Sequence, residues 1–498
     1  MKKNLKKLAA LLLSAAMVLS LAGCGDKEPA AAGDGAVESS AAAESDKAEE
    51  KAQTEEIVTL KWVAVGNGMP ENYDAWKEHI NEYLEEKIGV NLEFEVVAWG
   101  DWDNRRSVIV NTNEDYDILF TNLNTFSSDV NLGAFADITD IVKNTTPDLY
   151  SYIPESYWEA CSIDGKIYAV PTYKDSSVTQ YFVWDKELLD SYGLKVDDLH
   201  SLEDLTETLT VIKEKDNAPS FMLHKDGMPA VIANYYDGMG AGLLPIGVAF
   251  DDESRKVVST LEQPGVIEDF KLLHQWYKDG IINSDAATLA EAPKYRKCYV
   301  AQGWSGAAKT SWGPQMGVEA IAVQYDDTVI SNDSVQGSMN CISASSKHPE
   351  KALELLELVN TDSYVRDALY YGLEGDNFDY TADGKVEKHK EEWSMAGYTQ
   401  GTFFNVTQLV TDEFNQWEEV KELNANATPS VLLGISFDWT PVEDEMANCI
   451  EIWNRYKPEV LTGTTDPETT FPVIVEELKA AGMDAIIAEA QKQIDEAK

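Results

Sequence analysis

Two hydrophobic periods alternate along the first folded stretch of the chain. Apolar residues occupy every second position of 90–96, and β-forming residues fill 58–65, so both stretches are predicted strands. Between them, bulky apolar side chains recur every three or four residues and predict an amphipathic helix that Gly89 ends: Tyr73, Trp76, Ile80, Tyr83, Leu84 and Ile88. A helix over about 102–111 and a short buried strand over 117–121 continue the alternation. Strands that alternate with helices form a mainly parallel sheet, so the expected fold class is α/β.

A second α/β run begins near Tyr181, and the chain ends in helices. Ser201 and Asp204 have the spacing of a capping box, which predicts that a helix begins there. The further helices are expected over 202–215, 266–278, a stretch from 349 onward, 441–456 and 471–498. With 498 residues the chain is long enough for two or three domain-sized units and a large core.

The first residues have the pattern of an export signal. Four lysines precede an apolar run over 8–21, which is shorter than the roughly 20 residues that span a bilayer. The run ends in Leu21-Ala22-Gly23-Cys24, which resembles the lipobox of bacterial lipoproteins. That resemblance implies that 1–23 is a signal peptide cut before Cys24, and that Cys24 is then acylated. The alternative is an ordinary signal peptide in which the cysteine occurs by chance.

Residues 25–56 have a composition that cannot build a core. They are mainly Ala, Glu, Ser, Gly, Asp and Lys, with no aromatic residue and one proline, so we expect them to be disordered. A flexible coil of this length reaches roughly 30 Å. We therefore interpret 24–56 as a lipid-anchored linker that tethers the folded body to the outer face of the cytoplasmic membrane.

The charge and the cysteines exclude several partners. A net charge of −47 argues against nucleic acid and against spreading on an anionic membrane surface. No apolar run after Cys24 approaches 18 residues, so no second membrane segment is expected. The four remaining cysteines are widely spaced, without a metal-ligand pattern, and are expected to be buried small hydrophobic residues: Cys161, Cys298, Cys341 and Cys449. Disulfides are the alternative, because an exported protein can form them.

Three stretches carry a resemblance to a known family. These are Asp-Gly-Lys-Ile-Tyr-Ala-Val-Pro at 164–171, Gly-Ala-Phe-Ala-Asp-Ile at 133–138, and the stretch 181–194. They resemble segments of family 1 extracellular solute-binding proteins of ABC importers, which mostly carry sugars. Trp184-Asp185 stands where Tyr-Asn or Tyr-Asp is usual.

A narrower resemblance covers the C-terminal half. Residues 371–378 resemble a segment of the LplA-like lipoproteins, with Phe378 in place of tyrosine. Residues 433–442 and the helices after them resemble the uncharacterised C-terminal domain of that group. Together the resemblances span most of 57–498.

The resemblance implies a two-lobed, periplasmic-binding-protein-like (type II) α/β fold. A ligand would lie in a cleft between lobes that close by hinge motion, and the loaded protein would dock on an ABC permease. The implied domains are lobe 1 at 57–178 and 326–372, lobe 2 at 179–325 and 373–430, and a helical domain at 431–498 packed on lobe 2. We expect a monomer without a cofactor.

Aromatic and amide side chains follow the first predicted strands. Open α/β sheets bind ligands at the carboxyl ends of their strands, and the C–H face of a sugar lies flat on an aromatic ring. Trp99 and Trp102 follow the strand that ends near Val97, while Asn67 and Asn122 follow the two other strands. The alternatives are that Trp102 packs inward and that the asparagines are turn residues.

Other candidates come from composition and from the family resemblance. Tyr173 and Lys174 precede the first crossing between the lobes, and Trp304 lies between glycines. Asn340 and Glu374 have the alternatives of a turn residue and a helix cap. The predicted ligand-binding residues are Asn67, Trp99, Trp102, Asn122, Tyr173, Lys174, Trp304, Asn340, Glu374 and Phe404.

No catalytic motif accompanies these residues. The glycine-rich stretch 237–242 lacks the Lys-Ser/Thr of a phosphate loop, and Ser305 is not in a G-x-S-x-G elbow. The six histidines form no metal motif. The sequence therefore favours a carbohydrate receptor without catalysis; a receptor for peptides or other solutes and a secreted carbohydrate-active enzyme are the alternatives.

Overall fold

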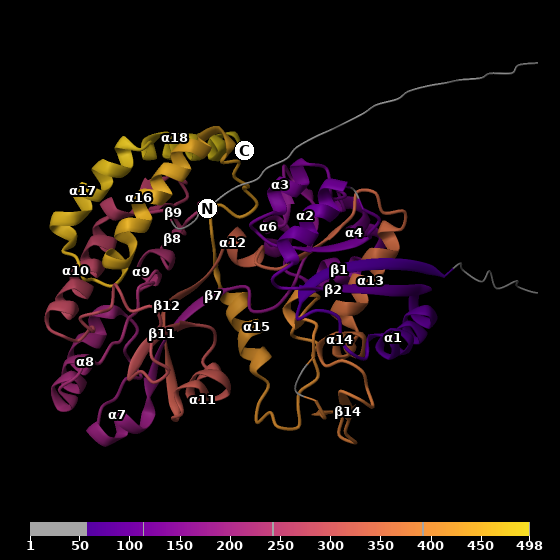
Figure 1. Ribbon diagram of the computed structural model, residues 1–498, viewed down its shortest axis with the longest axis horizontal. Coiled ribbons are helices and arrows are strands. Elements are labelled where there is room, and N and C mark those ends of the chain that lie inside the picture. The colour runs from indigo at the N-terminus through magenta and orange to yellow at the C-terminus, as the bar shows by residue number, and fades with distance from the viewer. Residues whose placement is uncertain (1–56, 113, 242–243, 391–392, 498) are drawn as a thin grey trace, which may run out of the picture. The chain divides into compact units, whose positions relative to one another are not determined.

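The computed structural model describes residues 57–112, 114–241, 244–390 and 393–497 (Figure 1). The signal peptide, Cys24 and the linker lie outside the described residues, so these interpretations stay predictions. Of the helices that the structure describes, none is long and apolar enough to cross a membrane. The mixed α/β fold class is confirmed.

A five-stranded sheet organises the first lobe. In spatial order its strands are β2 (Val90–Ala98), β1 (Val58–Gly66), β3 (Ile118–Thr121), β13 (Met339–Ile342) and β6 (Ala169–Pro171). β1 pairs in parallel with β2 and β3, whereas β13 runs antiparallel to both β3 and β6. The carboxyl ends of β1, β2, β3 and β6 therefore lie along one edge, which we call the carboxyl edge.

The helices that cover this sheet confirm much of the predicted pattern. They are α1 (Tyr73–Ile88), α2 (Trp102–Thr112), α3 (Phe126–Asn131), α4 (Thr139–Thr145), α5 (Pro147–Tyr152), α6 (Glu155–Ala160), α13 (Pro349–Thr361) and α14 (Ser363–Tyr370). Helix α1 ends at Gly89 in the left-handed conformation, with φ +66°, as the sequence predicts. Trp76 and Ile80 of α1 and Leu353 of α13 are buried in one core with the sheet.

A second sheet organises the other lobe. Its spatial order is β11 (Cys298–Gln302), β7 (Val178–Asp185), β12 (Ala320–Ile330) and β16 (Thr428–Pro429), with β7 antiparallel to both β11 and β12. The helices of this lobe include α7 (Lys186–Tyr192), α8 (Leu202–Asp216) and α10 (Pro264–Lys278), while α12 (Asn332–Val335) lies on the crossing segment from β12 to β13 and buries Val335 in the first core. Ser201 and Asp204 form the predicted capping box at the start of α8.

The C-terminal helices share the core of the second lobe. They are α16 (Glu443–Leu461), α17 (Pro467–Ala480) and α18 (Met483–Glu496), and their Trp453, Ile474 and Ile486 are buried with the other side chains of that core. The prediction of a single helix over 471–498 is wrong. Gly482 breaks it with φ +113°, and a Cβ at this position would lie 2.3 Å from Cγ of Glu445 on α16.

The stretch 373–430, expected in the second lobe, begins in the first. Met395 is buried in the first core, and Leu373, Trp393 and Phe404 pack against that core. The Nε1 proton of Trp393 is also donated to the Leu369 carbonyl of α14 at 2.9 Å. The chain reaches the second lobe only with α15 (Gln416–Asn426) and β16.

The Asn424 side chain joins the end of α15 to the first crossing segment, at 174–177. Oδ1 of Asn424 accepts a hydrogen bond from the Ser177 amide at 3.0 Å, and Nδ2 of Asn424 donates to the Lys174 carbonyl at 2.5 Å. The first crossing and the end of α15 are therefore held together. The four described cysteines are free and buried, which confirms their expected role as small hydrophobic residues.

Candidate functional site

The carboxyl edge brings four of the predicted residues onto one rim. Asn67 follows β1, Trp99 follows β2, Asn122 follows β3 and Tyr173 follows β6. These residues come from four separate segments of the chain, and the parallel register of the strands is what aligns them.

Trp99 presents an open aromatic surface at this rim. Its side chain is 50% exposed, although the residue is large and apolar. Its Nε1 proton is donated to Oδ1 of Asn67 at 2.8 Å, and the Tyr398 ring stacks on it at 6.2 Å with a 14° interplanar angle. The indole is thus held on one face and at its polar atom, while half of its surface remains open to a ligand.

Two other predicted aromatic residues are buried behind this rim. Trp102 is 7% exposed and packs against Phe120 at 5.6 Å, so the alternative of inward packing is the one that the structure shows. Tyr173 is also buried, and its ring meets Phe404 edge-on at 4.6 Å. Burial raises the pKa of Tyr173 to about 12. In this conformation both rings support the rim.

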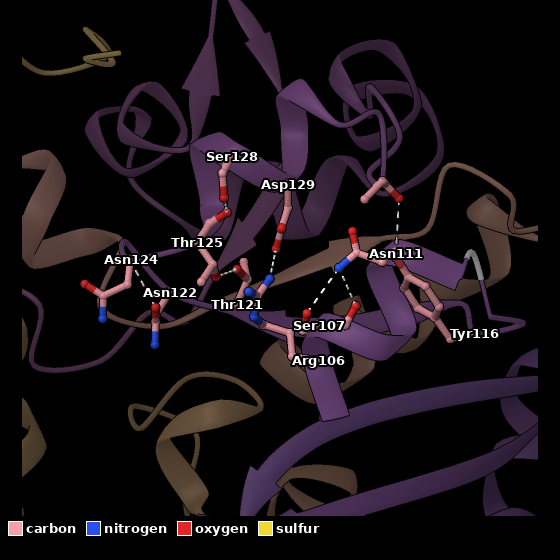
Figure 2. A network of polar contacts seen from close by, with 11 residues as sticks. Arg106, Ser107, Asn111, Tyr116, Thr121, Asn122, Asn124, Thr125, Ser128 and Asp129 are labelled. Atoms are coloured by element: carbon pink, nitrogen blue, oxygen red, sulfur yellow. Dashed lines mark hydrogen bonds and ion pairs between the residues drawn. The ribbon is translucent and has the colours of Figure 1, made fainter. Parts of the chain in front are cut away.

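Asn122 belongs to a polar turn after β3 (Figure 2). Its Oδ1 accepts a hydrogen bond from the Asn124 amide at 3.1 Å. Behind this turn, Arg106 of α2 forms an ion pair with the buried Asp129 of α3. Burial raises the pKa of Asp129, and the Arg106 guanidinium opposes that rise.

A loop at 394–404, which the sequence did not single out beyond Phe404, runs along the rim. Asn340, predicted as a ligand contact, is buried and donates from Nδ2 to the Thr399 carbonyl at 2.9 Å and the Gln400 carbonyl at 3.1 Å. The Ser338 hydroxyl donates to the Tyr398 carbonyl at 2.6 Å. Asn340 therefore positions the loop that carries Tyr398. Sequence reasoning missed Tyr398, because the stretch around it has no helical or strand periodicity that would predict its position.

Trp304 forms an aromatic cluster in the second lobe. Its ring lies 5.6 Å from that of Trp417 on α15, and Trp417 lies 4.6 Å from Phe403. Glu419 accepts the amide protons of Ser305 at 2.7 Å and Gly306 at 3.0 Å, which holds the turn. The Nε1 proton of Trp304 is buried and finds no acceptor among the described residues.

The structure does not gather the last predicted residues around an open surface. Nζ of Lys174 pairs with Asp175 at 3.0 Å. Glu374 forms an isolated backbone bridge with Phe378, next to a small hairpin. Phe404 packs on Tyr173 in the first lobe.

A polar cavity of about 350 Å³ lies between elements of the two lobes. Asn124 and Ser127 line it from the first lobe. From the second lobe and its crossing segments come Asp237, Asp333, Phe437 and Trp439, of which the last two rings stack at 5.5 Å. Trp439 both packs against the second core and lines this cavity.

Two of the three carboxyl groups that line this cavity, those of Asp237 and Asp333, lack a cationic partner among the interactions that the structure shows for them. Asp237 accepts from the Ser430 hydroxyl at 2.6 Å and the Met239 amide at 2.9 Å, and Asp333 accepts from the Gly240 amide at 3.2 Å. Burial and the neighbouring Asp237 raise the pKa of Asp333 to about 6. Within the described ranges, no group of three or more His, Cys, Asp or Glu residues could hold a metal ion.

Comparisons with known proteins place this geometry in context. The family of bacterial extracellular solute-binding proteins matches residues 78–372, and a domain of unknown function (DUF3502) matches 431–498. A carbohydrate ABC transporter substrate-binding protein of Streptococcus pneumoniae serotype 4 is 30% identical over 451 residues, covering 88% of this chain and 90% of the relative.

Solved structures give the same picture. The crystal structure of the N-glycan transport solute binding protein NgtS from Streptococcus pneumoniae is 28% identical, covers 88% of this chain and 98% of its own, and has a TM-score of 0.77. The same protein in complex with Man1GlcNAc has a TM-score of 0.65 at 28% identity, with 88% and 99% coverage. The chain is thus similar to these proteins over nearly all of its described length.

Proposed function

Since the chain belongs to the bacterial extracellular solute-binding proteins, a family of binding proteins and not of enzymes, we propose that it is a receptor that captures a sugar or oligosaccharide and delivers it to an ABC importer. The observation that carries the proposal is the Trp99 surface, which is open, backed by Tyr398 and fixed by Asn67. A rigid aromatic face beside amide groups suits a pyranose, whose C–H face stacks while its hydroxyls need fixed polar partners.

Motion between the lobes fits this role. The two NgtS structures have the same 28% identity to this chain, yet the TM-score is 0.77 for the first structure and 0.65 for the complex with Man1GlcNAc. Because the sequence compared is the same, the difference reflects conformation. We propose that ligand binding selects a closed arrangement of the lobes by contacting both of them.

We further propose that the receptor is a lipoprotein, tethered through Cys24 to the outer face of the cytoplasmic membrane. A basic start, a short apolar run and the Leu-Ala-Gly-Cys segment support this. Labelling of cells with a fatty-acid analogue should mark the protein, and Cys24→Ser should abolish the label and release the protein from the membrane fraction. A Cys24→Ser protein that keeps its label would exclude this anchor.

A receptor for cationic peptides or other cationic solutes is the second candidate. The observation in its favour is the pair of carboxyl groups of Asp237 and Asp333, which line the 350 Å³ cavity beside each other and lack a cation. A neutral sugar would leave both charges unpaired, whereas an ammonium group would balance them.

Thermal unfolding of residues 57–498 with a ligand panel separates these candidates. The panel contains neutral oligosaccharides, including Man1GlcNAc, and lysine-containing peptides as controls. A ligand at about 100 times its dissociation constant stabilises the folded state by roughly 2.7 kcal/mol, which raises Tm by a few degrees. A shift with sugars only supports the sugar receptor, and a shift with peptides only supports the second candidate.

A further inference from the structure

The stretch 373–430 lies between the two parts of the chain that match known families, 78–372 and 431–498. Within it, the 394–404 loop follows the carboxyl edge from β1 to β6. At one end the Asn67 amide donates to the Ser394 carbonyl at 2.8 Å, and at the other the Phe403 amide donates to the Tyr173 carbonyl at 3.2 Å. The loop therefore borders the rim from β1 to β6, and its Tyr398 reaches Trp99 at the end of β2.

A fully buried cation holds this loop from behind. Arg366 of α14 is 0% exposed. Its Nε donates to the Thr402 carbonyl at 2.6 Å and its Nη2 to the Gly397 carbonyl at 2.8 Å, while Nη1 lies 3.4 Å from Oε1 of Gln400. Burial lowers the pKa of Arg366 to about 10, so it remains charged at neutral pH. The planar guanidinium thus fixes several points of the loop at once.

Close packing leaves the loop little freedom against α13 and α14. A Cβ at Gly397 would lie 2.5 Å from the Tyr370 ring, and one at Gly401 would lie 2.5 Å from Cγ1 of Val359. Only glycine fits at these two contacts. A loop held in this way is preorganised, so little conformational entropy is lost when a ligand binds.

The cations at this rim are already balanced. Lys174 pairs with Asp175, Arg106 pairs with Asp129, and Arg366 is surrounded by the oxygens of the loop. An acidic sugar would bring a carboxylate to a strongly acidic protein, and the described part of this rim places no further cation to receive it. A neutral pyranose needs only the ring face of Trp99 and the neighbouring amides.

We propose that the 394–404 loop determines which sugar the receptor accepts, with Arg366 as its positioning residue, and that the unit bound there is a neutral pyranose stacked on Trp99. Tyr398 sets the plane of the Trp99 ring, and Arg366 sets the position of Tyr398 through the carbonyls on either side of it. The inference rests on the proposed sugar-binding function, and it adds a named recognition element to it.

Titration calorimetry of the full chain tests this. The probes are maltotriose, mannotriose and chitotriose as neutral sugars and trigalacturonic acid as an acidic one. We expect at least one neutral trisaccharide to bind and the acid not to bind. Tyr398→Ala should weaken that binding at least about tenfold. Tyr235→Ala, which removes a tyrosine ring that is 38% exposed in the second lobe, should leave it unchanged.

Arg366→Lys tests the positioning role separately. Lysine keeps the positive charge but lacks the several N–H donors of the planar guanidinium, so amide hydrogen exchange within 394–404 should become faster. The ratio of affinities among the neutral sugars should also change. If this variant does not fold, Tyr398→Ala still decides the recognition claim.

Three outcomes differ in meaning. Neutral sugars that bind Tyr398→Ala and the unaltered protein equally, or tight binding of the acid, would overturn the loop assignment and leave the sugar receptor standing. Unchanged exchange and unchanged ratios in a folded Arg366→Lys would overturn the positioning role. Failure of the unaltered chain to bind any saccharide of the probe set and the panel above would overturn the proposed function and the loop assignment together.

Discussion

The two lobes differ in how many of their polar groups near the candidate ligand site have a hydrogen-bond or ion-pair partner within the protein. In the first lobe, the polar atom of Trp99 is bonded to Asn67, and the buried Asp129 is paired with Arg106. In the second lobe, the N–H of Trp304 has no described acceptor. Asp333, on the crossing segment that leads from the second lobe to β13, accepts only a backbone amide proton among the interactions shown. Of these groups, those of the first lobe have a partner within the chain, whereas the N–H of Trp304 and the Asp333 carboxyl group could gain one from a ligand; Nε of Arg106 and the Tyr157 hydroxyl in the first lobe are also buried without a described partner.

A buried polar group without a hydrogen-bond partner lowers the free energy of unfolding, so this difference between the lobes should be measurable. A buried donor without a partner destabilises a fold by about 1–3 kcal/mol. We infer that the first lobe binds the ligand before closure and that the second gains its missing contacts on closure. The following substitutions test the contrast, from the largest expected effect to the smallest.

Neutralisation should stabilise the protein more at Asp333 than at Asp129. The pKa of Asp333 is raised to about 6 in the folded state, above its unfolded value of roughly 4. The cost of its charge is therefore present above pH 6 and disappears as pH falls towards 4. Asp333→Asn should stabilise the protein by up to about 3 kcal/mol at pH 7.5 and have little effect at pH 4.

Asp129→Asn is the matched substitution in the first lobe. Burial raises the pKa of Asp129 too, but the Arg106 guanidinium opposes that rise, so Asp129→Asn should stabilise the protein less than Asp333→Asn does at pH 7.5. Urea unfolding at both pH values measures these free energies. An equal or greater gain in stability for Asp129→Asn at pH 7.5 would contradict the contrast between the paired and the unpaired carboxyl group.

Trp99→Ala should have the largest effect on affinity. The substitution removes the open ring and should weaken sugar binding by about 2 kcal/mol, close to thirtyfold. Because the side chain is half exposed, the free energy of unfolding should change by less than about 1 kcal/mol. Calorimetric titration and urea unfolding measure the two quantities, and an unchanged affinity would remove Trp99 from the site.

Trp304→Phe keeps a six-membered aromatic ring and removes the five-membered ring of the indole together with its N–H. If a ligand oxygen accepts that proton on closure, affinity should fall by about 1 kcal/mol, roughly fivefold. Trp99→Phe is the matched control, since the N–H of Trp99 is already bonded to Asn67. A greater loss for Trp99→Phe than for Trp304→Phe would reverse the assignment of the unsatisfied donor.

Asn67→Ala should have the smallest effect. It removes the acceptor that fixes Trp99 but leaves the stack on Tyr398, so affinity should fall by about 0.5–1 kcal/mol. Fluorescence titration can resolve a change of this size. A loss as large as that of Trp99→Ala would show that Asn67 itself contacts the ligand.

The sequence predicted the elements that depend on local pattern. The α1 period, its end at Gly89 and the capping box at Ser201 follow from residue spacing alone. The sequence also predicted that Asn67, Trp99 and Asn122 lie along one edge of the sheet. The carboxyl ends of parallel strands meet at the same edge, however far apart the strands are in the sequence. Whether these residues bind ligand stays a prediction.

What depended on tertiary packing could not be predicted in the same way. Trp102 has the residue type of a ligand platform, yet Phe120 covers it. Tyr398 lies in a stretch without helical or strand period, and its position depends on Arg366 and Asn340, which precede it by 32 and 58 residues in the chain. The break at Gly482 requires the close approach of Glu445 on another helix.

The most direct measurement is calorimetric titration of residues 57–498 with the neutral oligosaccharides, together with recovery of the sugar afterwards. We expect saturable binding of at least one of them, intact sugar after release, and loss of most of that affinity in Trp99→Ala. No binding of any sugar, together with binding of lysine-containing peptides that Asp333→Asn abolishes, would contradict a sugar receptor built on the Trp99 surface.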